Sequence, residues 1–252
     1  MRLWDARIMS KIAIIIPSRL KAKRLPNKPL KLINNKEMVL HAYDVAINAK
    51  MGEVYVATPD KEIANLVQSY GGKSVITLGD HQTGTDRIFE VFQKDLKNEP
   101  QIIINLQGDM PNLDPSSIKT LVDHMKLKVC DIGTLASSLQ SEKEISDNDI
   151  VKVTTEKNIK DKEFSNAIDF FRSSKNSNIE NIYHHIGIYA FTNQALIRYV
   201  SLKRSNLEIS RNLEQLRALE NKMKIDVGYI KTFPLSVDTE KDLIEIKKIM
   251  EV

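Results

Sequence analysis

Five positively charged side chains fall within one short segment near the start of the chain. They are Arg19, Lys21, Lys23, Arg24 and Lys28. Three prolines between positions 17 and 29 stiffen this segment and exclude a regular helix. A rigid cationic loop suits a polyanion such as a triphosphate, although the segment lacks the G-x-x-x-x-G-K-[ST] pattern of a P-loop. The alternative is a solvated basic surface loop, which is the usual role of a charge run.

Two aspartates are candidates for binding a divalent metal ion. Asp109 follows the apolar run 101–106, and a carboxylate just past a buried strand needs a partner. Asp238 precedes Thr239, which approximates a capping box with Asp242, so the cap does not need Asp238. Mg²⁺ takes one or two carboxylates together with phosphate oxygens. The alternative for Asp109 is a turn residue that caps its own backbone.

A polar loop before a predicted helix offers another contact for phosphate. The helix runs over 85–97, with Thr85 as the expected N-cap and Asp86 near its positive end. Backbone N–H groups at such a helix start can contact a nucleotide. A capped helix start with no ligand is the alternative.

The elements that must position these residues alternate between strand and helix in the first half of the chain. Apolar β-branched runs predict strands, and apolar residues on one face predict helices. This alternation indicates βαβ units and a parallel sheet, where ligands sit beyond the carboxyl ends of the strands. The expected strands are 12–16, 53–58, 73–78 and 101–106, and the expected helices are 37–50, 60–70, 85–97 and 115–128.

The second half of the chain is less regular and richer in strands. No repeat or low-complexity linker marks a domain boundary. We therefore predict a loose extension over 1–8 and a single α/β domain over 9–252, with a smaller β-rich lobe at about 135–200. The expected strands are 131–139, 150–155, 166–171, 183–191 and 224–230, and the expected helices are 193–201, 211–219 and one that begins after Thr239.

Composition excludes several classes of protein. The chain has 252 residues, a net charge of +4 and 6% aromatic residues, which is too weak a signal for nucleic-acid binding. No apolar run is long enough to span a membrane, and the first ten residues lack the apolar core of a signal peptide. The single cysteine, Cys130, excludes a disulfide within the chain and fits a cytoplasmic location.

Seven segments, in order from about residue 9 onward, resemble the sugar-acid cytidylyltransferases. The resemblance implies a Rossmann-like nucleotide-diphospho-sugar transferase fold, in which helices flank a mainly parallel central sheet. It also implies a homodimer that pairs through the β-rich lobe. The segments are PSRLKAKRLPNKPL, DHQTGTDR, NLQGDMP, VKV, HIGIYAF, LEQLRALE and VDTEKDL.

The resemblance also implies a reaction. The branch most similar to this chain transfers CMP from CTP to the anomeric hydroxyl of an eight-carbon sugar acid, 3-deoxy-D-manno-octulosonate (Kdo). The products are pyrophosphate and CMP-Kdo for lipopolysaccharide biosynthesis, and the cofactor is Mg²⁺. The alternatives are CMP transfer to 8-amino-Kdo or to a nonulosonic (sialic-type) acid, and a non-catalytic nucleotide-binding module.

Roles follow from the matching motif positions. The resemblance assigns the nucleotide to Arg19, Arg24, Lys28, Thr83, Gly84 and Gln107, and the metal to Asp109 and Asp238. Catalysis falls to Arg19, Lys28, Asp109 and Asp238, and the last three should converge on one cavity. The sugar acid falls to Arg172, His185, Glu214 and Gln215. Each of these four has a plainer alternative: a surface charge, a packed histidine or a solvated helix face.

Two single positions and one short run depart from the family pattern. Met110 stands where glutamate usually follows the QGD aspartate, and residues 173–178 are a polar run where a proline and a tryptophan are common. Ser236 replaces a usual glycine. Met110 removes a polar neighbour of the expected metal site, and the run at 173–178 borders the expected acceptor site, so the sequence specifies the nucleotide more firmly than the acid.

Overall fold

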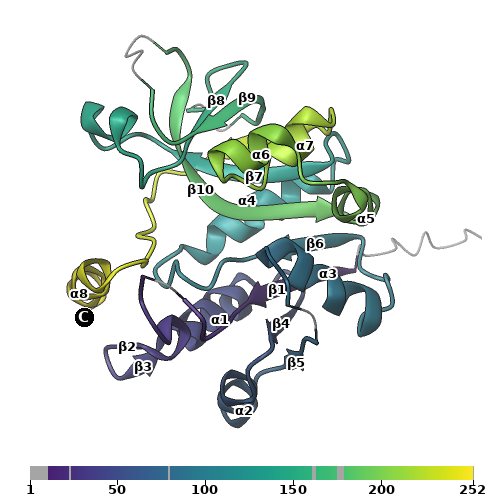
Figure 1. Ribbon diagram of the computed structural model, residues 1–252, viewed down its shortest axis with the longest axis vertical. Helices are drawn as coiled ribbons and strands as arrows, with labels where there is room; N and C mark the ends of the chain where they lie inside the picture. Colours follow the sequence, from purple (N-terminus) through teal and green to yellow (C-terminus); the bar gives the residue numbers. More distant parts are fainter. Residues whose placement is uncertain (1–10, 23, 79, 161–162, 175–178, 252) are drawn as a thin grey trace, which may run out of the picture.

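The computed structural model describes residues 11–22, 24–78, 80–160, 163–174 and 179–251. The extension predicted over 1–8, the cation Lys23 and part of the polar run, 175–178, lie outside these residues. Within the described residues, nine strands form one twisted sheet in the order β5-β4-β1-β6-β10-β7-β11-β9-β8 (Figure 1). Helices cover both faces of the sheet, so the predicted α/β class is confirmed.

Strand β10 divides the sheet into two parts. It runs antiparallel to β6 on one side and to β7 on the other, whereas β5, β4, β1 and β6 are mutually parallel. The carboxyl ends of β1 and β6 therefore lie at the same edge. The strands are β1 Ile12–Pro17, β4 Glu53–Thr58, β5 Ser74–Ile76, β6 Ile102–Asn105, β7 Ile132–Ser137, β8 Lys152–Thr155, β9 Ser165–Phe171, β10 Ile182–Thr192 and β11 Ile225–Tyr229.

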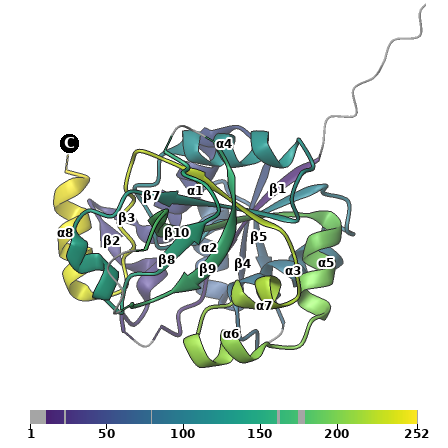
Figure 2. The same cartoon turned by 90° about the horizontal axis from the view of Figure 1, so that it is seen from above.

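Strand β1 is buried on both faces, as its unbroken apolar run predicts. Ile14 and Ile16 pack into a core with α1 and α4, and Ala13 and Ile15 pack into a core with α3 and α5. Figure 2 shows α4 and α5 on opposite sides of the strands. The helices are α1 Met38–Ala49, α2 Lys61–Ser69, α3 Gly84–Lys94, α4 Pro115–Met125, α5 Asn193–Ser201, α6 Asn206–Arg211, α7 Leu216–Glu220 and α8 Glu240–Ile249.

The last helix packs away from both main cores. Helix α8 contacts a small hairpin, β2 Leu32–Ile33 and β3 Lys36–Glu37, through a third apolar cluster. The predicted capping box is present, because the Thr239 hydroxyl accepts from Asp242 N and the Asp242 carboxylate accepts from Thr239 N. Figure 1 shows α8 beside this hairpin. None of the described helices combines the length and apolar character needed to cross a bilayer.

Two helix predictions are wrong in detail. The range 211–219, expected as one helix, holds the last residue of α6, a turn over 212–215 and most of α7, because Asn212 adopts a left-handed conformation (φ 52°) that ends α6. The N-cap of α3 is Thr83 rather than Thr85, since the Thr83 hydroxyl accepts from Asp86 N at 3.1 Å. The first difference places Glu214 and Gln215 in the turn between α6 and α7.

Candidate active site

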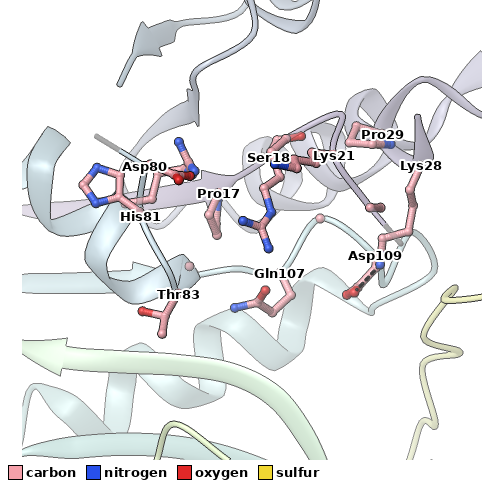
Figure 3. A pocket seen from close by; sticks show the side chains of 15 residues that line it. Pro17, Ser18, Lys21, Lys28, Pro29, Asp80, His81, Thr83, Gln107 and Asp109 are labelled. Atoms are coloured by element: carbon pink, nitrogen blue, oxygen red, sulfur yellow. Dashed lines mark hydrogen bonds and ion pairs between the residues drawn. The ribbon is translucent and has the colours of Figure 1, made fainter. Parts of the chain in front are cut away.

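A cavity of about 450 Å³ opens beyond the carboxyl end of β1. The cationic loop forms one wall, and the segments after β6 and before α3 form the others. Figure 3 shows Lys28 and Asp109 at one end of this cavity, Asp80 and His81 at the other, and Gln107 between them. Asp109 lines this cavity, and so do five of the residues predicted to bind the nucleotide. These five are Arg19, Lys28, Thr83, Gly84 and Gln107.

Lys28 joins the two predicted metal ligands. Its Nζ lies 2.8 Å from Asp109 Oδ2 and 3.0 Å from Asp238 Oδ1. Burial alone would lower the pKa of Lys28, but the two carboxylates outweigh burial and raise it, so Lys28 stays charged. Residues separated by 210 positions in the chain thus meet at one point. The three side chains therefore meet as the sequence predicts, although only Lys28 and Asp109 line the cavity itself.

Backbone contacts hold Asp238 beside Asp109. Val237 N donates to Asp109 O at 2.9 Å. The Val237 side chain is fully buried in the third apolar cluster, and the capping box of α8 begins two residues later. Anchors on both sides therefore fix the position of Asp238, although its own side chain is 38% exposed.

Arg24 lies outside the cavity wall. Its Nη2 contacts Asp238 Oδ2 at 2.9 Å, and its side chain is 57% exposed. It is therefore linked to the cluster of Lys28, Asp109 and Asp238 through a single carboxylate. The sequence groups Arg24 with the other nucleotide-binding residues, whereas the structure places it one contact further out.

Close packing brings the start of α3 against the end of β1. A Cβ added to Gly84 would lie 3.1 Å from Pro17 Cγ, which is tighter than most real contacts, so this position favours glycine. Thr83 caps α3, and the first backbone N–H groups of α3 therefore lie near the cavity. Gln107 follows β6 and donates to Asn105 Oδ1 at 3.2 Å.

A second cavity, of about 430 Å³, shares Thr83, Gly84 and Gln107 with the first. Three of the four residues predicted to bind the sugar acid line it, namely His185, Glu214 and Gln215. His185 comes from β10, and the other two come from the turn between α6 and α7. The two cavities are therefore neighbours with a common wall.

A buried hydrogen-bond chain runs through this common wall. Gln107 donates to Asn105, the Asn105 amide donates to Thr85 Oγ1 at 3.1 Å, and Thr85 donates to Glu214 Oε1 at 3.1 Å. The second carboxylate oxygen of Glu214 is buried and has no partner among the described residues. Burial raises the pKa of Glu214. Because an unpaired buried oxygen is costly, Glu214 is suited to a hydroxyl group of a ligand.

His185 is a neutral side chain in a packed position. Its ring Nε2 lies 3.0 Å from Thr134 Oγ1, and its ring meets the Phe170 ring edge-on at 5.0 Å. Burial, with a smaller effect from His184, lowers the pKa of His185 to about 3. His185 therefore presents a neutral ring to the second cavity.

Arg172 does not lie with the other predicted acid-binding residues. It follows β9, donates from Nη1 to Asn148 O at 3.1 Å, and lines a separate cavity with Arg211. The polar run that replaces the family's proline and tryptophan begins beside it, at Ser173. The second cavity thus lacks the carboxylate partner that the sequence predicts for it.

Met110 also lies elsewhere than the sequence analysis expects. Its side chain is 4% exposed and packs in the core of α1 and α4, and it lines neither cavity. The methionine in place of the family's glutamate is therefore a change in core packing. It gives no reason to expect a different acceptor.

Sequence reasoning missed several residues that line the two cavities, among them Arg87, Tyr189 and Arg204. Arg87 lines the first, where burial and then the charge of Arg19 lower its pKa. Tyr189 and Arg204 line the second. Arg87 and Tyr189 lie inside quoted motifs, DHQTGTDR and HIGIYAF, so those motifs could have identified them. Arg204 lies outside every motif.

Comparison with known proteins places the chain among nucleotidyl-transferring enzymes. A family model described as "Cytidylyltransferase" matches residues 13–225. The 3-deoxy-manno-octulosonate cytidylyltransferase of Bartonella tribocorum is 40% identical over 238 residues, which are 94% of this chain and 97% of that protein. The same-named protein of Brucella ovis is 40% identical over 234 residues, which are 92% of this chain and 93% of that protein.

Solved structures agree with this placement. The structure of CMP:2-keto-3-deoxy-manno-octonic acid synthetase complexed with CTP matches with a TM-score of 0.86 and 34% identity, over 96% of this chain and 98% of that one. The 4-diphosphocytidyl-2C-methyl-D-erythritol synthase of Anaerococcus prevotii matches with a TM-score of 0.64 at 14% identity, over 96% and 98% of the two chains. The second match shows a shared fold alone.

Proposed function

Because this chain belongs to the cytidylyltransferase family, we propose that it transfers CMP from CTP to the anomeric hydroxyl of Kdo. The products are CMP-Kdo and pyrophosphate, and CMP-Kdo would be used in lipopolysaccharide biosynthesis. The names of the relatives at 40% identity support the acceptor, and the CTP complex of the similar structure supports the nucleotide. The single observation that carries the proposal is the pair of adjoining cavities with a common wall.

The arrangement of charges fits nucleotidyl transfer. The attacking oxygen forms a bond to the α-phosphorus, and the bond from that phosphorus to the oxygen bridging to the β-phosphate breaks. Pyrophosphate leaves with the electron pair, and the hydroxyl proton passes to solvent water. Such a transfer depends mainly on positioning and on neutralising charge. Arg19 and Lys28 face the first cavity and would neutralise the triphosphate. Gln107 and Thr83 lie on the wall that the two cavities share and would contact the transferred group.

We propose that Asp109 and Asp238 hold Mg²⁺. Their side chains fit the ion, because both carboxylates already surround one cationic centre, the Lys28 ammonium, at 2.8 and 3.0 Å. When bound, Mg²⁺ would supply further positive charge to the phosphate oxygens. Val237 and the cap of α8 fix the position of Asp238, so its carboxylate lies beside that of Asp109 without a large rearrangement of the chain.

The other readings of the sequence have weaker support. An 8-amino or nonulosonic acceptor was suggested by Met110 and by the polar run at 173–178. Met110 lies in the core, and the described part of the run borders a different cavity. A non-catalytic nucleotide-binding module does not need a second cavity with an unpaired carboxylate oxygen.

We further propose a cytoplasmic homodimer. The family resemblance places the pairing surface in the lobe at about 135–200, where Ile168 on β9 is 59% exposed. An exposed large apolar side chain on a strand near the sheet edge is suited to such a contact. Light scattering on the purified protein tests this, with twice the chain mass expected and the single-chain mass as the contrary result.

Pyrophosphate release tests the proposed function. The protein is incubated with Mg²⁺, with each of CTP, UTP, ATP and GTP, and with each of Kdo, 8-amino-Kdo and a sialic acid. We expect rapid release only with CTP and Kdo. Faster release with another acid would replace the acceptor, and no release with any pair would contradict the enzyme assignment.

A further inference from the structure

We propose that Arg204 binds the carboxylate of the sugar acid. The inference rests on the proposed function and adds a recognition residue to it. The acceptor is an anion, and a carboxylate entering a partly enclosed cavity needs a cation or several hydrogen-bond donors. Among the described residues that line the second cavity, Arg204 is the only one that carries a positive charge. His185 is neutral there, because burial holds its pKa far below neutral pH.

The positive charge of Arg204 is not consumed by its neighbours. Arg204 Nε donates to Glu208 Oε1 at 3.0 Å, but Arg217 also binds this carboxylate, through two contacts of 2.7 and 2.8 Å. Glu208 and Arg217 are both almost completely buried and form a bidentate pair. Two arginines thus face one carboxylate, which leaves about one positive charge at this corner of the cavity.

Arg204 also has donors free for a ligand. Its side chain is 42% exposed, and the remaining contact among the described residues is a long one, 3.4 Å from Nη1 to Gln82 Oε1. The capping box of α6 fixes Glu208, which in turn orients the Arg204 guanidinium. An oriented guanidinium with open N–H groups is the usual partner of a carboxylate.

Arg172 is the competing candidate. It lines another cavity, and its Nη1 donates to a backbone carbonyl of residue 148. The structure therefore assigns the carboxylate to a residue outside every motif shared with the family.

The test compares an acid with its uncharged analogue. The KM values of Kdo and of Kdo carboxamide are measured for the wild type and for Arg204→Gln, Arg204→Lys and Arg172→Gln. The matched control is Arg198→Gln, on the surface of α5, whose Nη2 donates to Asn221 O. We expect Arg204→Gln to raise the KM of Kdo by about 10-fold or more while leaving the KM of CTP within twofold. The wild-type preference for acid over amide should disappear, and Arg204→Lys should retain part of it.

Two results would overturn the inference. One is an equal rise in both KM values, which a merely structural or neutral contact would cause. The other is loss of the acid preference in Arg172→Gln instead. Titration calorimetry measures the affinities for Kdo and for its carboxamide without turnover. Wild-type protein that binds neither compound, or binds both equally, would also overturn the inference. Wild-type protein that binds Kdo in preference to the amide but releases no pyrophosphate would contradict the proposed function alone.

Discussion

The two cavities recognise their ligands by different physical means. The first presents partly exposed charges, with the Lys28 ammonium between Asp109 and Asp238 and further cations on the same loop. The second presents more deeply buried groups, with a histidine whose pKa is lowered by burial, a glutamate whose pKa is raised by burial and, among the described residues, one cation, Arg204. The difference suggests that charge attracts and holds the nucleotide, whereas exact fit of hydrogen bonds selects the acid.

The largest effect should come from the ion cluster of the first cavity. We expect Asp109→Asn to lower kcat by about 10³-fold, because it removes one of the two charges proposed to hold Mg²⁺. Pyrophosphate release at saturating substrates measures it. Asp123→Asn, on the exposed face of α4, is the matched control and should keep wild-type activity. Nearly full activity of Asp109→Asn would show that the metal assignment is wrong.

The loop cation between the two aspartates should matter next. We expect Lys28→Gln to lower kcat/KM for CTP by about 10²-fold, since a charge aimed at the phosphates is lost. The KM of Kdo should change much less, which separates the two cavities kinetically. Lys21→Gln alters a cation of the same wall that has no ion pair among the described residues, and its effect should be smaller. An equal effect on both substrates would contradict the division of labour.

The neutral His185 of the second cavity should make the free energy of unfolding depend on pH under acidic conditions. Burial lowers the pKa of His185 to about 3 in the folded chain. As pH falls below about 6.5, the unfolded chain therefore binds a proton at this residue that the folded chain does not bind. Folding stability is therefore lost as pH falls below 6.5. We expect His185→Asn to abolish a loss of about 3 kcal/mol between pH 6.5 and pH 4, measured by urea unfolding. Tyr189→Phe, in the same cavity, should keep the wild-type profile, and an unchanged profile in His185→Asn would refute a neutral buried ring.

The smallest effect should come from Arg24. Its side chain is 57% exposed and makes a surface ion pair with Asp238, and such pairs are weak and screened by salt. We expect Arg24→Gln to raise the KM of CTP by about threefold at low ionic strength and to have no effect in 0.5 M salt. A 10-fold rise that persists in high salt would place Arg24 among the direct phosphate contacts.

The first cavity was predictable because each of its walls is formed by a short segment that is continuous in sequence. The apolar run of β1 followed by cations, and the QGD turn after β6, each identify a strand end, and parallel strand ends meet at one edge. Asp238 was found by elimination, since the cap of α8 does not use its side chain. The fold class followed from the same alternation of strands and helices.

The second cavity depends on features that periodicity does not reveal. The left-handed Asn212 ends α6 and turns Glu214 inward, whereas the pattern of 211–219 predicts one amphipathic helix. Arg172 sits at a strand end whose direction depends on the pairing of β8 and β9. Arg204 acquires its role from the pairing of Glu208 with Arg217, which is a tertiary contact.

One measurement tests the central claim most directly. Phosphorus NMR of the wild-type protein with CTP, Kdo and Mg²⁺ follows every phosphorus atom of the nucleotide. We predict that one phosphodiester signal and pyrophosphate appear in equal amounts as CTP disappears. Inorganic phosphate with CDP, or unchanged CTP, would contradict the account.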